Sequence, residues 1–462
     1  MTRLGPGSRP AAGTAHFIGI GGAGMAPVAQ LLAARGWLVS GSDARDGATL
    51  ARLRSLDIAV HLGHDPAQVP NDATVVISTA VSEDNPELRA ARERGLPVIH
   101  RSEALVLAAE GRDFIAIAGA HGKTTTSAML AVALDAAGGD PSFAIGGRVL
   151  DLDASARLGS GSAFVAEADE SDGSFLTYRP RIAVVTSVEP DHLDHYGSAA
   201  ALHEAFDDFA ARVQPGGLLI CCADDQGAAE LAQRHAATQR VLTYGTSAAP
   251  AGVDAHVQLH DVHVEGHRAR ADLGDNAVRL SLAVGGAHNL RNAAAAWCAG
   301  VELGTDPQRL ARGLGEFTGT GRRFERRGEA AGVTVVDDYA HHPTEVEATL
   351  RHARAAAGEG SGRVLVLFQP HLYSRTATFA ASFARALGQA DLAIVTDVYG
   401  AREEPMPGVT GATITRHMPV DRGRYVAEGA VAARAIASVA TAGDLVLTVG
   451  AGDVTDLAPV IL

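Results

Sequence analysis

The sequence predicts an α/β protein of three domains, each built on a mostly parallel sheet. Short apolar runs alternate with helical patterns along most of the 462 residues, which is typical of doubly wound sheets. Two glycine-rich turns, at residues 19–25 and 119–126, each separate an apolar run from a helical pattern. Between residues 241 and 284 the pattern becomes β-like, with stretches of strict alternation that predict a small antiparallel annex.

The composition limits the kind of partner that the protein can have. Lys and Arg number 39 against 53 Asp and Glu, a formal net charge of −14, so we expect neither nucleic acid nor an anionic membrane as a partner. No apolar run is long enough to cross a bilayer, and residues 1–15 read as a loose tail without the apolar core of a signal peptide. The three cysteines lack the spacing of a zinc site or of a disulfide framework. We therefore expect a cytoplasmic protein.

The first predicted domain begins with a glycine-rich turn. Gly19, Gly21 and Gly24 match the pattern G-x-G-x-x-G, which places a diphosphate at the N-terminus of the helix predicted for residues 26–35. Asp43 lies about 20 residues further on, where a dinucleotide-binding fold carries its ribose acid; a solvated turn is the alternative for this residue. The pattern leaves the nucleotide open, because NAD, FAD and a UDP-sugar all fit. The strands predicted in this segment are residues 16–20, 37–40, 74–78 and 97–100.

The second glycine-rich turn, GAHGKTTT at residues 119–126, has the context of a phosphate-binding loop. It lies between an apolar run at 114–118 and a helical pattern at 124–137, so backbone N–H groups and the helix N-terminus would face the phosphates. Lys123 would reach the outer phosphates, and the Thr124 hydroxyl would ligate Mg²⁺. Lys123 is also the only lysine in the chain, which indicates a demand that arginine's planar fork does not meet. A chance glycine turn with a surface lysine is the alternative.

Two acidic stretches, EADESD at 167–172 and SVEPDHLDHY at 187–196, follow apolar runs of the same segment. The carboxyl ends of parallel strands form the edge at which α/β sheets bind ligands. Glu167 is placed as a metal ligand or water anchor, because Mg²⁺ takes few protein ligands and prefers oxygen. For His192 residue type alone favours a structural role, because imidazole suits softer ions. Plain loop charges are the simplest interpretation of the other carboxylates in the first stretch, Asp169, Glu170 and Asp172.

The remaining polar motifs lie near the ends of predicted elements. Asn289 and Asn292 of GAHNLRN begin an alanine-rich helix, as a cap or as donors to a base edge. Four arginines within residues 319–327 form either a solvated face or a phosphate clamp. DDYAHHP and QPHLYSRT each follow an apolar run, and Pro343 is expected to open a helix. The strands predicted here are residues 333–336, 364–368, 392–396 and 445–449.

Together these motifs resemble those of the Mur ligase family, from about residue 16 to the C-terminus: GIGGAGM, STAVSEDNPE, AGAHGKTTT, EADESD, PDHLDHY, GAHNLRN, GRRFE, DDYAHHP and QPHLYSRT. The resemblance implies a Rossmann-like UDP-sugar-binding domain at 1–110 with a loose tail at 1–14. It also implies a central P-loop ATPase domain with the annex at 111–321, and a Rossmann-like domain closing over ATP at 322–462.

The resemblance also implies an activity. GIGGAGM, STAVSEDNPE and DDYAHHP match the members that join L-alanine to the carboxylate of UDP-N-acetylmuramate in peptidoglycan synthesis. ATP and Mg²⁺ would be the cofactors, an acyl phosphate the intermediate, and ADP and phosphate the products. We expect a monomer or a weak homodimer.

The same resemblance implies the role of each site residue. The ATP site would consist of Gly119, Ala120, His121, Gly122, Lys123, Thr124, Thr125, Asn289, Asn292, Arg323 and Asp338. The UDP-sugar site would consist of Gly21, Gly22, Ala23, Gly24, Met25, Ser42, Asp43, Ser78, Thr79 and Ala80. The amino-acid pocket would consist of Tyr339, His341, His371 and Arg375. The magnesium ligands would be Thr124, Glu167 and His192. For His192, the role that the family implies thus replaces the structural role that its residue type alone favours. The catalytic residues would be Lys123, His192 and His341, and the general base stays open among His192, His341 and Asp338.

Two departures from the family pattern leave questions open. Several relatives hold a second magnesium with a carbamylated lysine, but this chain has no lysine there and carries Asp207 and Asp208 nearby. Leu372 stands where some alanine-adding members have arginine, which leaves room for glycine or serine as acceptors.

Three other functions compete with this one. An NAD-dependent oxidoreductase would use the first domain but has no need for the second phosphate site. A nucleotide-sensing module leaves DDYAHHP and QPHLYSRT without a purpose. A ligase that adds a whole peptide to recycle muropeptides would need a wider acceptor site than His371 and Arg375 indicate.

Overall fold

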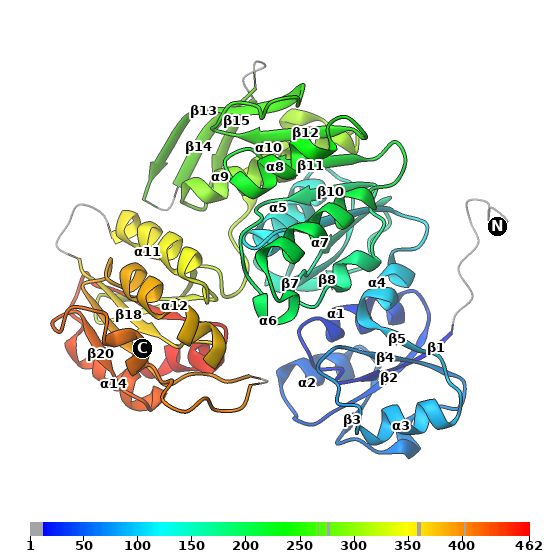
Figure 1. Cartoon of the computed structure of the whole chain (residues 1–462), viewed down its shortest axis with the longest axis horizontal. Coiled ribbons are helices and arrows are strands. Elements are labelled where there is room, and N and C mark those ends of the chain that lie inside the picture. Colours follow the sequence, from blue (N-terminus) through cyan, green and yellow to red (C-terminus); the bar gives the residue numbers. More distant parts are fainter. Residues whose placement is uncertain (1–12, 267, 275–277, 358–361, 402) are drawn as a thin grey trace. The chain divides into compact units, whose positions relative to one another are not determined.

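The computed structural model in Figure 1 describes residues 13–266, 268–274, 278–357, 362–401 and 403–462. Most of the predicted N-terminal tail thus lies outside the described residues. Contacts divide the chain into two compact units. The first unit comprises Met1–Arg148, Asp153–Val257 and Ala295–Leu310, and the second comprises Val149–Leu152, Gln258–Ala294 and Ala311–Leu462.

The first sheet of unit 1 is parallel throughout, in the order β3-β2-β1-β4-β5. β1 lies at its centre, where Phe17 and Ile18 are at most 1% exposed. The four predicted strands are present with shifts of one to three residues, but β3 was not predicted, because this edge strand is partly exposed and lacks a clear apolar pattern. The strands are β1 (Thr14–Ile18), β2 (Leu38–Asp43), β3 (Ala59–Leu62), β4 (Ala73–Ile77) and β5 (Val98–His100). The helices are α1 (Met25–Ala34), α2 (Ala48–Ser55), η1 (Pro66–Gln68), α3 (Pro86–Glu93) and α4 (Arg101–Ala109).

The second sheet continues in the order β12-β11-β10-β6-β9-β7-β8. Its middle strands are buried on both faces and read as unbroken apolar runs, as expected for parallel strands covered by helices. The strands are β6 (Asp113–Ala118), β7 (Ser142–Val149), β8 (Ala154–Arg157), β9 (Ala163–Glu167), β10 (Ile182–Val185), β11 (Leu218–Cys222) and β12 (Val241–Gly245). The helices are α5 (Lys123–Ala136), η2 (Leu150–Leu152), η3 (Ser174–Thr177), α6 (Leu193–Tyr196), α7 (Ala199–Ala211) and α8 (Gln226–His235).

An antiparallel meander follows, made of β13 (Ala255–Glu265), β14 (Arg268–Leu273) and β15 (Val278–Leu282). The predicted annex is therefore present, but it begins later than expected. β12 was placed within it and instead pairs in parallel with β11, because period and composition do not distinguish the direction of a strand. The helices after the meander are α9 (Ala287–Glu302) and α10 (Pro307–Glu316).

The third sheet belongs to unit 2 and has the order β16-β17-β21-β18-β19-β20. β16 is antiparallel to β17 and the other pairs are parallel. One apolar cluster joins the sheet to α11 and α12, and a second joins its other face to α14, so both faces are covered (Figure 1). The strands are β16 (Glu325–Ala330), β17 (Val333–Asp338), β18 (Val364–Phe368), β19 (Leu392–Val395), β20 (Gly423–Tyr425) and β21 (Leu445–Val449). The helices are α11 (Pro343–Ala357), α12 (Tyr373–Leu387), α13 (Ala412–Thr415), α14 (Gly429–Val439), η4 (Asp453–Leu457) and α15 (Ala458–Ile461).

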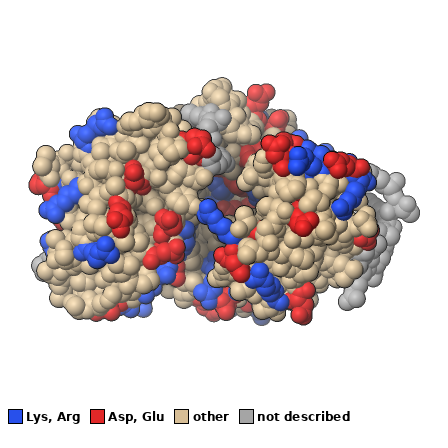
Figure 2. All heavy atoms as spheres, turned by 90° about the horizontal axis from the view of Figure 1, so that it is seen from below, with Lys and Arg blue, Asp and Glu red and all other residues tan. Residues whose placement is uncertain are grey.

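These three sheets confirm the predicted α/β class. None of the helices in the described part of the chain is both long and apolar enough to cross a membrane. On the face seen in Figure 2, acidic and basic side chains are interspersed over the described surface.

Candidate functional site

The phosphate-loop sequence forms a tight turn between β6 and α5. Gly119 has a φ of +129° and Gly122 a φ of +82°, a region that glycine enters without strain. A Cβ added at Gly119 would lie 2.3 Å from Thr186 Oγ1, so a side chain is excluded there. The turn delivers the chain to the N-terminus of a 14-residue helix, where unpaired N–H groups favour a bound anion.

Lys123, the first residue of α5, is held by an acidic partner. Its Nζ donates to Glu170 Oε1 at 2.8 Å and to the Gly119 carbonyl at 2.6 Å, and Glu170 is 1% exposed. Burial alone would lower the pKa of the Lys123 ammonium, but Glu170, followed by Asp169 and Glu167, outweighs burial and raises it. The loop therefore carries a fixed positive charge near neutral pH.

The interpretation of Glu170 as a plain loop charge is wrong. The acidic run gave no sign of burial, because runs of this kind are usually solvated. A usable signal was the single lysine of the sequence, since a buried ammonium needs a counter-charge nearby.

Of the predicted magnesium ligands, Thr124 and Glu167 are in direct contact, and His192 lies in the loop after the neighbouring strand β10, near Glu170. Thr124 Oγ1 donates to both oxygens of Glu167, at 3.0 and 3.1 Å, and Gly146 N donates to Glu167 Oε2 at 2.9 Å. His192 adopts a φ of +53°, and its Nε2 lies 3.9 Å from Glu170 Oε1. The hydroxyl of Thr124 and the carboxylate of Glu167 at the mouth of the phosphate loop are oxygen donors that fit Mg²⁺ completed by phosphate oxygens and water, whereas the imidazole of His192 is a less usual ligand for this ion.

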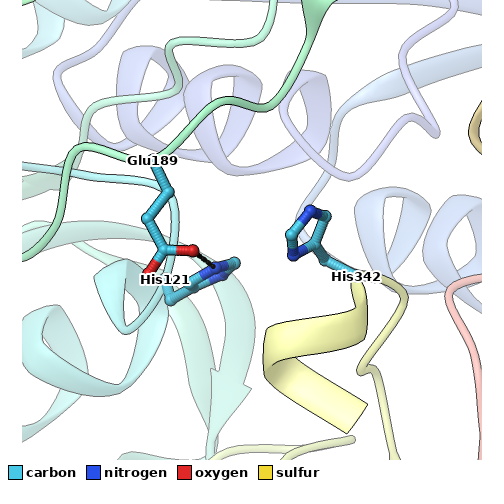
Figure 3. A group of neighbouring side chains, drawn as sticks. All are labelled: His121, Glu189 and His342. Carbon is cyan, nitrogen blue, oxygen red and sulfur yellow. Dashed lines mark ion pairs between the residues drawn. The ribbon is translucent and has the colours of Figure 1, made fainter. Parts of the chain in front are cut away.

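His121, inside the phosphate loop, faces a second acidic residue of the same unit. Figure 3 shows its ring directed toward the Glu189 carboxylate, with Nε2 and Oε2 3.4 Å apart. The third side chain drawn, His342, belongs to unit 2 and immediately precedes α11. The backbone of the loop is bonded to the segment that follows β10, because His121 N donates to Ser187 Oγ at 3.0 Å.

In the first sheet, the glycine-rich turn is fastened to the end of β2. Gly21 N donates to Asp43 Oδ2 at 2.9 Å, so Asp43 is a support of the turn and not a solvated residue. Ser42 is fully buried and its hydroxyl donates to Glu87, with His64 Nδ1 at 2.8 Å. Exposed backbone at the turn is contributed by Gly22, Ala23 and Gly24. Met25 is buried in α1, and Ser78, Thr79 and Ala80 follow the neighbouring strand β4.

The two other carboxylates of the acidic stretch are also paired. Asp169 and Asp172 both contact the Arg101 guanidinium, with Nη2 to Oδ2 distances of 3.1 and 3.3 Å. Their interpretation as plain loop charges is wrong as well. Arg101 was missed because its partners lie about 70 residues away, and only a three-dimensional arrangement brings them together.

Asn289 and Asn292 lie within α9 and not at its cap. Both are buried, Asn289 Nδ2 donates to the Gly285 carbonyl at 2.7 Å, and Asn292 Nδ2 donates to Asn289 Oδ1 at 3.3 Å. The cap interpretation of Asn289 is wrong, because its side chain donates where a cap would accept.

Asp338, at the end of β17, accepts hydrogen bonds from the segment before β16, from the loop after β17 and from α11. Its carboxylate accepts from Phe324 N at 2.8 Å, Ala340 N at 2.9 Å and Thr349 Oγ1 at 3.0 Å. Burial raises its pKa, and Arg323 is the first of the groups that oppose this. The Arg323 guanidinium lies 5.2 Å from the centre of the Tyr339 ring.

The predicted amino-acid pocket contains a series of neighbouring rings. The ring centres of Tyr339 and His341 are 5.3 Å apart, and those of His341 and His371 are 5.8 Å apart. His371 also stacks on Tyr399, with ring centres 5.9 Å apart and planes at 15°; Tyr399 was not predicted. Arg375, 7% exposed, lies in the first turn of α12.

Two further residues bear on the departures noted above. Leu372 is 5% exposed and has a φ of +68°, which is strained for a branched side chain. Asp207 is paired with Arg234 at 2.9 Å and with His235 at 3.0 Å, so its carboxylate is already engaged between α7 and α8.

Comparison with known proteins gives consistent matches over nearly the whole chain. Three family models match: "Mur ligase family, catalytic domain" over residues 14–113, "Mur ligase middle domain" over 117–300, and "Mur ligase, glutamate ligase domain" over 322–452.

Similar curated proteins include two named UDP-N-acetylmuramate–L-alanine ligase. The one from Kineococcus radiotolerans is 57% identical over 97% of this chain and 96% of its own length. The one from Paenarthrobacter aurescens is 53% identical with the same coverage. A crystal structure of UDP-N-acetylmuramate-alanine ligase from Thermotoga maritima is also similar, with a TM-score of 0.81, 28% identity and 97% coverage of both chains. A murein peptide ligase from Psychrobacter arcticus has a TM-score of 0.71 at 24% identity and 97% and 98% coverage, which shows a shared fold alone.

Proposed function

The chain belongs to the Mur ligase family, and we propose that it joins L-alanine to the carboxylate of UDP-N-acetylmuramate in peptidoglycan precursor synthesis. The family consists of ATP-dependent ligases that form amide bonds. Relatives more than 50% identical over 97% of the chain carry the name of the alanine-adding enzyme. The family match gives an NAD-dependent oxidoreductase or a sensing module no support.

The chemistry requires activation of the sugar-linked carboxylate. A carboxylate is a poor acyl donor, because oxide would have to leave. Attack of a carboxylate oxygen on the γ-phosphorus of ATP forms an acyl phosphate and releases ADP. The alanine amine then attacks the acyl carbon, the bond to phosphate breaks, and the amide and inorganic phosphate remain.

The single observation that carries this proposal is the Lys123 ammonium at the N-terminus of α5, held in place by Glu170 at 2.8 Å. A fixed cation at this point offsets the negative charge on the transferring phosphoryl group. Gly119, Ala120, His121 and Gly122 form the turn before Lys123, and Thr125 lies in the first turn of α5; we assign these five residues to the ATP phosphates.

We assign Thr124, Glu167 and His192 to Mg²⁺, on the donor set described above. When bound, the ion supplies charge neutralisation and orientation of the ATP phosphates. Thr124 and Glu167 are already mutually aligned by their hydrogen bonds, so the chain itself fixes the direction of the oxygen donors.

The remaining assignments are proposals of the same kind. The adenosine and phosphates of ATP are assigned to Asn289, Asn292, Arg323 and Asp338. The sugar nucleotide is assigned to Gly21, Gly22, Ala23, Gly24, Met25, Ser42, Asp43, Ser78, Thr79 and Ala80. Ser42 is fully buried, and it would act by supporting the turn, because its carbonyl accepts from Gly19 N at 2.8 Å and from Ile20 N at 2.9 Å. The acceptor is assigned to Tyr339, His341, His371 and Arg375, with Arg375 as the partner of the alanine carboxylate. Domain boundaries at 110 and 321, a cytoplasmic location and a monomer or weak homodimer complete the proposal.

The test is ADP release by the purified protein with UDP-N-acetylmuramate, ATP and a panel of free amino acids and peptides. We expect release that depends on L-alanine and on Mg²⁺, with glycine and serine weaker. Release that depends on a tripeptide, and not on free alanine, would favour the peptide-adding alternative. No release with any acceptor would refute the proposed function.

A further inference from the structure

Arg101 lies where three functional segments of unit 1 meet. It is the first residue of α4, directly after β5, and its side chain is 17% exposed. On one side it contacts Asp169 and Asp172 of the acidic stretch that follows β9. On another side it borders the glycine-rich turn, since a Cβ added at Gly24 would lie 3.0 Å from Arg101 Nη1.

The acidic stretch connects these contacts to the phosphate loop. Asp169 precedes Glu170, which holds Lys123 at 2.8 Å. The Asp169 carboxylate contacts Arg101 at 3.1 Å, so adjacent residues of one stretch contact the two cations, Asp169 the guanidinium and Glu170 the ammonium.

Asp172 provides a second link between the same segments. Its Oδ2 accepts from Thr79 Oγ1 at 3.2 Å and lies 3.7 Å from His100 Nε2, and its side chain is 8% exposed. Thr79 follows β4 and is itself assigned to the sugar nucleotide. Buried carboxylates of this kind require a partner, because an unpaired buried charge is strongly unfavourable. The Arg101 guanidinium is therefore shared between Asp169 and Asp172. A phosphate bound at the glycine-rich turn would compete with these two carboxylates for the same guanidinium.

We propose that Arg101 is a positioning residue that couples the glycine-rich turn to the phosphate loop. A nucleoside diphosphate sugar bound at residues 21–25 draws the guanidinium toward its phosphates and away from Asp169 and Asp172. The acidic stretch then shifts, and with it the hold of Glu170 on Lys123. This inference rests on the proposed function and adds to it a route by which one substrate changes the affinity for the other.

The test measures binding and not turnover. The dissociation constant of a non-hydrolysable ATP analogue is determined by calorimetry with Mg²⁺, in the presence and absence of saturating UDP-N-acetylmuramate. We expect the two constants of the unaltered protein to differ by about fivefold or more, in the range usual for coupled sites. In Arg101→Met the two constants should agree within about twofold, because the shared cation is gone. Arg101→Lys keeps the charge but not the planar fork, and should fall between the two.

A matched control is Arg234→Met, which also breaks an arginine–aspartate pair, here with Asp207, between α7 and α8. It should keep the ratio of the unaltered protein. If Arg101→Met leaves Asp172 buried and unpaired and does not fold, the double variant Arg101→Met with Asp172→Asn removes both charges and should also give equal constants.

Either variant with the unaltered ratio overturns the proposal, and so does an unaltered protein whose two constants are equal. ADP release by the unaltered protein is measured in parallel. Release with no coupling of binding refutes the role of Arg101 and leaves the proposed ligase intact. Coupling without alanine-dependent release refutes the proposed acceptor and leaves the role of Arg101 standing.

Discussion

The phosphate-loop edge of unit 1 and the assigned acceptor region of unit 2 are built on different physical principles. At the phosphate loop, Lys123 and Glu170 are opposite charges that hold each other in a largely buried setting. In the acceptor region, the rings of Tyr339, His341 and His371 are neighbours, with centres 5.3 and 5.8 Å apart, and charge contributes less directly, through Glu345 at 3.3 Å from His341 and two guanidinium groups over Tyr339. The first region should therefore respond most to changes of charge, and the second most to changes of shape and of a single anchoring cation.

The largest effect is expected from Lys123→Ala. It removes the fixed cation at the start of α5, and ADP release should fall by about 10²–10³-fold, as for loss of one preorganised charge donor. Lys123→Arg should restore little, because a planar fork does not replace a compact ammonium between Gly119 O and Glu170. Steady-state rates at saturating substrates measure both. Near-normal ADP release by Lys123→Ala would show that the activity does not depend on this cation, and would contradict the charge-based account of the phosphate loop.

Glu170→Gln tests whether the buried charges depend on each other. It leaves the Lys123 ammonium without its nearest counter-charge, and the free energy of unfolding should fall by about 3 kcal/mol. Urea unfolding of this variant, of Lys123→Ala and of the double variant forms a cycle. The double variant should be more stable than the sum of the two losses predicts. Strict additivity would show that the pair is not coupled.

Arg375→Ala tests the acceptor region. Loss of the buried guanidinium that we propose as the partner of the alanine carboxylate should raise the KM for alanine by roughly 10- to 100-fold. The KM values for ATP and UDP-N-acetylmuramate should change by less than about threefold, since the loss concerns a single ligand. Equal increases for all three substrates would contradict the assignment and indicate a disturbed fold.

The smallest effect concerns charge that serves stability alone. Asp444, which precedes β21, is 3% exposed, and its pKa is lowered to about 2. Burial opposes this shift, while bonds from Arg363 and Thr441 produce it. The folded carboxyl therefore binds its proton more weakly than the unfolded one, so its contribution is present above about pH 4 and is lost as the pH falls toward 2. Asp444→Asn should cost about 2 kcal/mol of unfolding free energy at pH 7 and much less at pH 2. A loss independent of pH would refute this account.

Sequence reasoning was most successful where local pattern determines structure. Both glycine-rich turns and the apolar central strands such as β6, β18 and β21 lie within a few residues of their predicted positions. The edge strands β16 and β20 were missed, because they carry few apolar residues. Each pairs with only one neighbouring strand, so the sequence shows no buried apolar run there. The sequence pattern also did not reveal whether a strand pairs in parallel or antiparallel with its neighbour, as the parallel pairing of β12 with β11 shows.

The assigned site divides in the same way. Lys123 and Thr124 could be identified from their own loop, where spacing dictates geometry. Glu170 and Arg101 could not, because their importance lies in pairs that are 47 and 68 residues apart in the chain. Tyr399 was missed for a related reason: its stacking on His371 depends on two loops that meet only after β18 and β19 lie side by side.

The presence of one lysine in the chain has a practical consequence. Protein grown with lysine that carries ¹⁵N at the ε position contains a single labelled ammonium, located at the phosphate loop. Its nuclear magnetic resonance spectrum would hold one side-chain signal, free of overlap and without any need for assignment. Each added substrate could then be followed, in solution and in real time, at the atom on which phosphoryl transfer is proposed to depend.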